Sequence, residues 1–229
     1  MSFVKVTTAD GQTMQAFEVL SANKNAPGLV LIQEIFGVNA SMRQLAKDWA
    51  ERGFNVWCPD LFFRTEPGLE LDPTNKAQFD LGVEIMQELD TAQTLADLES
   101  TRQQLATKLG HDNIVAVGYC LGGRLVVEMA ANSPLKAAVS YYGVSLENVV
   151  PPMQATAPAL LHIAENDEWV QGDALATIQA QVAQREGWES YVYAGCDHAF
   201  ARPKGHHFNA EADALAVQRS VDFLALHTK

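Results

Sequence analysis

Apolar and polar residues alternate in blocks that predict strands and helices in turn. Short apolar runs rich in β-branched and aromatic residues, bounded by turn-forming residues, predict strands. They lie at 4–8, 14–20, 28–32, 54–58, 113–117, 136–142, 159–163 and 190–193. Helical spacing predicts helices over 76–109 (two, meeting near Asp90-Thr91), from 121 to about 132, over 173–185 and over 209–227. Ser41 is expected to cap a further helix that ends near Arg52, with Gly53 stopping it.

The order of these elements predicts the fold class. Buried strands separated by helices are typical of a mostly parallel sheet with helices on both faces. The first two strands flank Asp10-Gly11, which favours a hairpin at an antiparallel edge. We therefore expect one α/β domain over residues 1–229 with about eight strands. No apolar run approaches the ~20 residues of a membrane span, and the first 20 residues hold no signal-peptide core, so we expect a soluble, cytoplasmic chain.

Composition and charge limit the classes of molecule that the chain is expected to bind. The chain holds 16 Lys and Arg against 28 Asp and Glu, a formal net charge of −12. Such an acidic chain is a poor candidate for binding nucleic acid or an anionic membrane. The sequence predicts no oligomeric state.

The chain contains three cysteines, Cys58, Cys120 and Cys196, and their wide spacing includes no C-x-x-C pair. That spacing excludes a zinc ribbon or a thioredoxin-type motif, and an odd count in a chain of this size argues against a disulfide framework.

Cys120 lies in a G-x-C-x-G motif between a predicted strand and a predicted helix. Gly118 and Gly122 flank it, which is the nucleophile-elbow pattern with Cys in the place of Ser. The turn is tight, so small residues are needed on both sides. The turn would place the thiol in a crevice and point the Leu121 N–H at a developing oxyanion. The nearby helix N-terminus would favour the thiolate over the thiol. The alternative is a glycine-rich turn with an incidental buried cysteine.

An elbow of this kind calls for an acid and then a histidine in chain order. Asp167 follows the strand at 159–163, and His198 follows the strand at 190–193. His198 could act as the general base, with Asp167 holding its tautomer. Three other acids remain rivals of Asp167 in this region: Glu165, Glu168 and Asp197. We expect no metal site and no cofactor, and His162, inside a strand, is expected to be a core residue.

Five segments carry a resemblance to the dienelactone hydrolase (carboxymethylenebutenolidase) family of the α/β-hydrolase superfamily. They are Gln33-Glu34-Ile35-Phe36-Gly37, Cys58-Pro59-Asp60-Leu61, Gly118-Tyr119-Cys120-Leu121-Gly122-Gly123, Tyr141-Tyr142-Gly143-Val144 and the run Asp197-His198-Ala199-Phe200-Ala201-Arg202-Pro203. The resemblance covers nearly the whole chain, and the cysteine in the elbow distinguishes this family from the serine enzymes of the superfamily.

The resemblance implies an α/β-hydrolase fold and a catalytic triad of Cys120, His198 and Asp167. It also implies that Glu34 takes the thiol proton when substrate binds. Partial desolvation of that carboxylate would make it a usable base, whereas the alternative is a solvated loop residue. By the same resemblance the Ile35 N–H joins that of Leu121 in the oxyanion hole.

Further residues match substrate-binding positions of the family. Arg202 matches the arginine that holds the substrate carboxylate, a role suited to a planar guanidinium. Arg64 also matches a family position, where it could instead serve structure alone. Tyr142 matches a pocket-lining residue, and Phe36 and Trp169 could add apolar wall.

The chain departs from the well-known family members at one place. They carry a second arginine and aromatic residues on the helix after the proline-rich loop, whereas residues 65–101 here hold no Arg, Tyr or Trp. Lys76 is the only cation in that stretch, so it substitutes for the arginine or the physiological substrate differs. The sequence thus predicts a cysteine-dependent hydrolase of a small ester or lactone, including one bearing a carboxylate, that forms an acyl-thioester. The alternative is a ligand-binding or redox-sensing protein without turnover.

Overall fold

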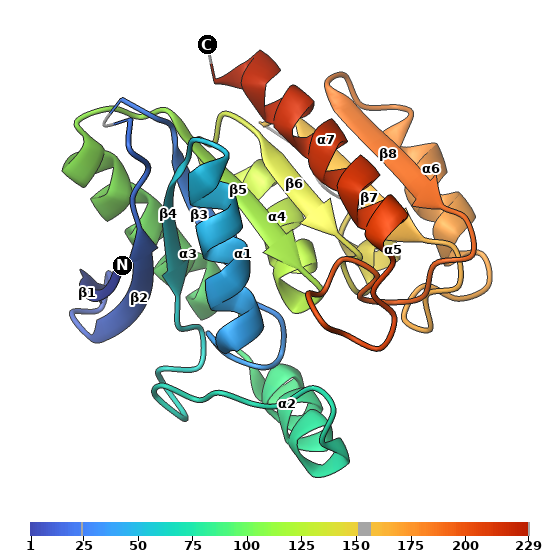
Figure 1. Ribbon diagram of the computed structural model, residues 1–229, viewed down its shortest axis with the longest axis horizontal. Helices are drawn as coiled ribbons and strands as arrows, with labels where there is room; N and C mark the ends of the chain where they lie inside the picture. Colours follow the sequence, from blue (N-terminus) through green and yellow to red (C-terminus); the bar gives the residue numbers. More distant parts are fainter. Residues whose placement is uncertain (24, 151–156, 229) are drawn as a thin grey trace. The chain divides into compact units, whose positions relative to one another are not determined.

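The structure is a computed structural model that describes residues 1–229 apart from 24, 151–156 and 229 (Figure 1). The chain divides into two compact units, residues 1–115 and residues 116–229, and each is described by itself. No helix in the described part of the chain is long and apolar enough to cross a membrane.

The first unit contains four strands in the order β1-β2-β4-β3. Their bounds are β1 Ser2–Thr7, β2 Thr13–Val19, β3 Gly28–Ile32 and β4 Asn55–Pro59. The pairs β1–β2 and β2–β4 are antiparallel, whereas β3 and β4 are parallel. The predicted opening hairpin is therefore confirmed, and every residue of β3 and β4 is buried, as expected for strands covered on both faces.

Three helices belong to the first unit: α1 Ala40–Glu51, α2 Lys76–Glu88 and α3 Thr91–Leu109. Figure 1 shows α1 and α3 on opposite faces of these strands, while α2 stands beyond one end of them. The two predicted helices between 76 and 109 are confirmed, and Asp90 caps the second one. The prediction for the cap of α1 is wrong, because Asn39 rather than Ser41 accepts the Met42 N–H at 3.1 Å. Asn39 is held in that place by donating to the Leu71 carbonyl.

The second unit contains parallel strands in the order β5-β6-β7-β8. They are β5 Ile114–Tyr119, which begins at the end of the first unit, β6 Ala138–Tyr141, β7 Ala159–Ala164 and β8 Trp188–Tyr193. The helices are α4 Leu121–Asn132, α5 Leu146–Val149, α6 Ala174–Val182 and α7 Ala210–His227. In Figure 1, α7 covers one face of these strands and α4 and α6 cover the other.

The predicted fold class is confirmed: the structure has eight strands, mostly parallel, with helices on both faces. The differences lie at the element ends, where β6 begins two residues later than predicted and α6 ends three residues earlier. The four-residue helix α5 was not predicted, because one turn is too short to show a helical period.

Candidate active site

The turn between β5 and α4 holds Cys120 in a strained backbone conformation. Its φ is +56° and its ψ is −115°, a region that a residue with a side chain rarely adopts. A Cβ on Gly118 would lie 2.0 Å from the Gly122 carbonyl oxygen, and a Cβ on Gly123 would lie 2.7 Å from that of Tyr141. Glycine is therefore required where the strand and helix approach each other, and this geometry is that of a nucleophile elbow.

The second unit brings His198 and Asp167 together as the sequence predicts. His198 Nδ1 lies 2.9 Å from both carboxylate oxygens of Asp167. An ionised carboxylate only accepts hydrogen bonds, so Nδ1 carries the proton and Nε2 is left to act as a base. The three rival acids are exposed, whereas Asp167 is buried. The structure therefore selects Asp167 among the four carboxylates.

The charge state of His198 depends on Cys120 and on Asp167. Burial opposes protonation of this imidazole. The negative charge of Cys120 and the hydrogen bond that His198 donates to Asp167 outweigh burial and raise the pKa of His198 to about 10. Its Nε2 is buried, and no group in the described part of the chain meets hydrogen-bond geometry with it. The raised pKa favours the imidazolium form of His198 at ordinary pH.

Aromatic rings enclose the His198 imidazole. Tyr142 meets it edge to face at a centroid distance of 5.1 Å, and Trp169 does so at 6.4 Å. The backbone N–H of Trp169 also donates to the Asp167 carboxylate, which connects Trp169 to the acid. Tyr142 has a φ of +38°, a second strained residue beside the elbow. The predicted pocket-lining position of Tyr142 therefore places it against the candidate base.

In the first unit, Glu34, Ile35 and Phe36 follow β3 and are all buried. Gln33 holds the start of this segment, since its side-chain oxygen accepts the Leu61 N–H. Helix α2 packs closely on it, because a Cβ on Gly82 would lie 2.7 Å from the Ile35 carbonyl oxygen. Glu34 is thus a buried carboxylate at the carboxyl end of a strand and not a solvated loop residue.

The three predicted cationic residues differ in their surroundings. Arg202 lies in the loop after His198 and is partly buried. Its backbone N–H donates to the Ala199 carbonyl. Arg64 forms ion pairs with Asp97 at 2.7 Å and with Asp10 at 2.8 Å, so its guanidinium holds the fold of the first unit. Lys76 is exposed on α2 and pairs with Asp80, four residues on.

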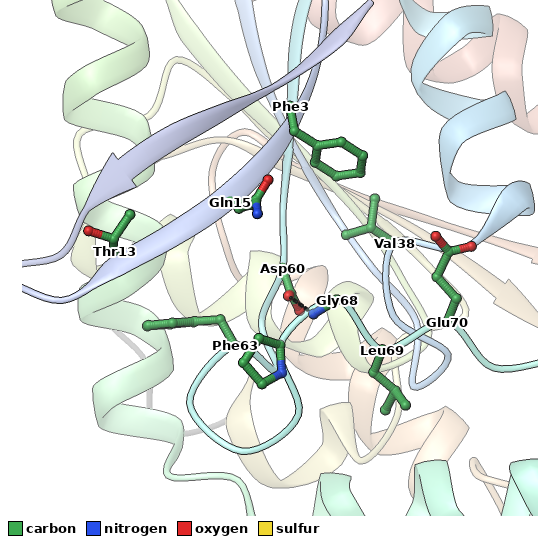
Figure 2. Close-up of a pocket in the computed structure, with 10 residues that line it drawn as sticks. Phe3, Thr13, Gln15, Val38, Asp60, Phe63, Gly68, Leu69 and Glu70 are labelled. Atoms are coloured by element: carbon green, nitrogen blue, oxygen red, sulfur yellow. Dashed lines mark hydrogen bonds between the residues drawn. The ribbon is translucent and has the colours of Figure 1, made fainter.

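A pocket of about 390 Å³ lies in the first unit, and its lining includes none of the predicted site residues (Figure 2). The opening hairpin and the loop after β4 form it, with Phe3 and Phe63 among its apolar walls. Asp60 faces it and accepts N–H groups of Phe62 and Gly68, which closes the loop. No pattern in the sequence pointed to this pocket.

Sequence reasoning missed the residues that support the His198 loop. His207 lies nine positions further on, and its Nδ1–H donates to the His198 carbonyl at 3.0 Å. Phe200 is fully buried between Tyr142 and Tyr193. The family motif included Phe200, but nothing in spacing or composition assigned it a contact. Across the described ranges, no group of three or more His, Cys, Asp or Glu side chains could hold a metal ion.

Comparisons with known proteins show which family the chain belongs to. The model of the dienelactone hydrolase family matches residues 14–228. An Azospirillum brasilense protein ascribed to carboxymethylenebutenolidase is 36% identical over 99% of both chains, and the Pseudomonas putida carboxymethylenebutenolidase is 34% identical over 97% of this chain and 95% of its own. A crystal structure of a Klebsiella pneumoniae protein ascribed to the dienelactone hydrolases has a TM-score of 0.84 at 27% identity, covering 98% of this chain and 97% of that chain. The chain is therefore a member of the dienelactone hydrolase family.

Proposed function

We propose that this hydrolase cleaves a small ester or lactone through an acyl-thioester on Cys120. The observation that carries the proposal is the elbow cysteine, held at a φ of +56° in the same unit as a buried His198–Asp167 pair. Relatives named carboxymethylenebutenolidase support the reaction class. The positive end of α4, at which Cys120 lies, favours a thiolate, the nucleophilic form of cysteine.

The proposed reaction has two halves. The Cys120 thiolate attacks the carbonyl carbon, and the carbonyl electron pair becomes an oxyanion that accepts the Leu121 N–H. When the oxyanion collapses, the C–O bond of the ester breaks, and the leaving oxygen takes a proton from His198. Neutral His198 then removes a proton from water, the hydroxide attacks the thioester, and the acid leaves as the thiolate re-forms.

Glu34 and Ile35 complete the proposal from the first unit. The family resemblance assigns the thiol proton to Glu34 and a second oxyanion N–H to Ile35. Burial of both residues supports those roles, because groups shielded from bulk water act more strongly on a reacting charge.

Arg202 is the cation that we propose to hold a substrate carboxylate. Arg202 lies four residues after His198, on the same loop, and is partly buried there. Because residues 65–101 supply no arginine, we propose the class of ester or lactone and not dienelactone itself. The test compares a neutral aryl ester with one bearing a carboxylate, each on the wild type and on Arg202→Ala. In the variant, KM should rise by about 10- to 100-fold for the charged ester only.

Cys120→Ala tests the proposed nucleophile. We expect turnover of a small aryl ester to fall by at least about 10⁴-fold, because no other group can form the acyl-enzyme. Cys196→Ala is the matched control, since Cys196 is equally buried in the same unit, and it should keep most of the activity. Wild-type turnover by Cys120→Ala would refute the assignment of Cys120 as the nucleophile. Saturable ligand binding without turnover by the wild type would favour a binding or redox-sensing protein.

A further inference from the structure

A chain of buried polar groups links β6, β7, β8 and α7 behind the His198 loop. His162 on β7 lies 2.8 Å from the Ser220 hydroxyl through Nε2 and 2.8 Å from the Tyr193 hydroxyl through Nδ1. Tyr141 lies 2.8 Å from the same Ser220 oxygen, and Arg219 reaches the Tyr193 hydroxyl at 3.2 Å. His162, Tyr141 and Ser220 are at most 1% exposed.

One assignment of protons satisfies the groups around His162 together. In this assignment the Ser220 hydroxyl donates its single proton to the Ala216 carbonyl at 2.8 Å. The Ser220 oxygen then accepts the hydrogen bond from His162 Nε2–H. Burial, followed by the charge of Arg219, lowers the pKa of His162 to about 3, so the ring is neutral at ordinary pH. A neutral imidazole with Nε2–H has a bare Nδ1, and the Tyr193 O–H must donate to it. The tilt of the Tyr193 ring is thereby determined.

The Tyr193 ring supports the turn that carries His198. It stacks on Phe200 at a centroid distance of 4.7 Å and an interplanar angle of 29°. Phe200 in turn meets Tyr142 edge to face at 5.6 Å, and Tyr142 meets the His198 ring. A line of ring contacts therefore runs from Tyr193 to the candidate base.

The chain between His198 and Phe200 is strained. Ala199 has a φ of +64°, in the left-handed region that is unfavourable for a residue with a side chain. Such a conformation persists only where the surrounding packing enforces it. The fixed Phe200 side chain is the packing element directly after the strained residue.

We propose that Tyr193 and His162 are positioning residues for His198, acting through Phe200. The hydrogen bond from Tyr193 to His162 fixes the ring on which Phe200 packs, and Phe200 keeps the turn at Ala199 in the conformation that aims His198. This inference rests on the proposed catalytic role of His198.

Tyr193→Phe tests the inference, because it keeps the ring on Phe200 and removes only the hydroxyl. We expect kcat for a neutral aryl ester to fall by about tenfold with KM within about twofold, since a small misplacement of a catalytic group slows the chemical step. The pH midpoint of thiolate absorbance, read against Cys120→Ala, should also move, because His198 no longer keeps its place beside Cys120. If the variant does not fold, His162→Gln removes the same bond from the other side while keeping a donor to Ser220, and it should give the same shifts.

Two controls separate positioning from stability alone. Tyr191→Phe makes the same change two residues away on β8, where the hydroxyl meets only the exposed Glu189, and should leave kcat unchanged. Thr101→Val removes a fully buried hydroxyl outside this cluster and should lower the unfolding temperature with kcat within about twofold. Wild-type kcat and an unmoved thiolate midpoint in Tyr193→Phe would overturn the inference. The thiolate titration needs no substrate, so it reports on positioning even if the wild type hydrolyses no ester and the proposed function fails.

Discussion

The reactive pair of this protein combines a strained residue and a buried charge. Cys120 is held at positive φ, and His198 has its pKa raised to about 10 although burial alone would lower it. The rise in the pKa of His198 comes from the charge of Cys120 and from the hydrogen bonds to Asp167, whose two oxygens each lie 2.9 Å from Nδ1. Removing the acid should therefore change both the charge state and the aim of the imidazole.

Asp167→Asn is the residue-scale prediction. An amide carries no charge, so the pKa of His198 should fall from about 10 and the imidazolium should be lost at lower pH than in the wild type. We expect kcat to fall by about 10²- to 10⁴-fold, because the tautomer is no longer enforced. The pH dependence of thiolate absorbance and of kcat measures both effects. Glu168→Gln, an exposed acid of the same loop, is the matched control, and equal losses in the two variants would contradict the role of Asp167.

The residues of the pair could be predicted from the sequence, but their supports could not. Chain order and the family motif pointed to Asp167, while its rivals were separated only by exposure, which a local pattern does not contain. The ion pairs of Arg64 with Asp10 and Asp97 join residues 54 and 33 positions apart. Such distant pairings follow from the folded chain, so the structural use of Arg64 was left open by the sequence.

At the scale of elements, the elbow depends on how closely β5 approaches α4. The contact at Gly118 involves backbone atoms of Gly122 and Gly123, which have no flexible end that could move aside. By contrast, an added Cβ at Gly53 would meet nothing within 4 Å, although the φ of Gly53 is +97°. The two glycines thus separate the cost of close packing from the cost of backbone conformation.

Gly118→Ala should lower the free energy of unfolding by about 3 kcal/mol or more, since the overlap with backbone forces the strand and helix apart. Gly53→Ala should cost only about 1 kcal/mol, the conformational penalty of a side chain at positive φ. Urea denaturation of both variants measures the difference. Equal losses would show that the elbow tolerates a wider separation than the structure has.

Elements were predicted well where a period or a turn signal was long enough. The strand β3 and the break between α2 and α3 follow from apolar runs and from Asp90 before a helical pattern. The start of α1 was missed because two residues with capping side chains lie close together, and a tertiary bond from Asn39 to Leu71 decides between them. The pocket of Figure 2 brings together residues from 3 to 70, which no window of sequence describes.

At the scale of the whole molecule, the net charge of −12 is the dominant feature. Like charges repel within a compact chain, and dissolved salt screens that repulsion over about 8–10 Å at ordinary ionic strength. Added salt should therefore stabilise this protein.

Raising sodium chloride from about 0.01 M to about 0.15 M should raise the unfolding temperature by about 2–4 °C, equivalent to about 1 kcal/mol in a chain of this size. Scanning calorimetry measures the change, and choline chloride at the same concentrations should give the same result if screening is the cause. We also expect a single cooperative transition, since the family model matches 14–228 as one piece. A fall in unfolding temperature with salt would contradict the role of self-repulsion, and two separate transitions would contradict the single-domain prediction.

The central claim is that the acyl group passes through Cys120. Wild-type protein mixed with p-nitrophenyl acetate and quenched in acid within the first turnover should gain the mass of one acetyl group. Fragmentation should place that group on Cys120, and hydroxylamine should remove it, as expected for a thioester. Turnover with no acyl-enzyme in the quenched protein, or with the acetyl group on another residue, would contradict the account.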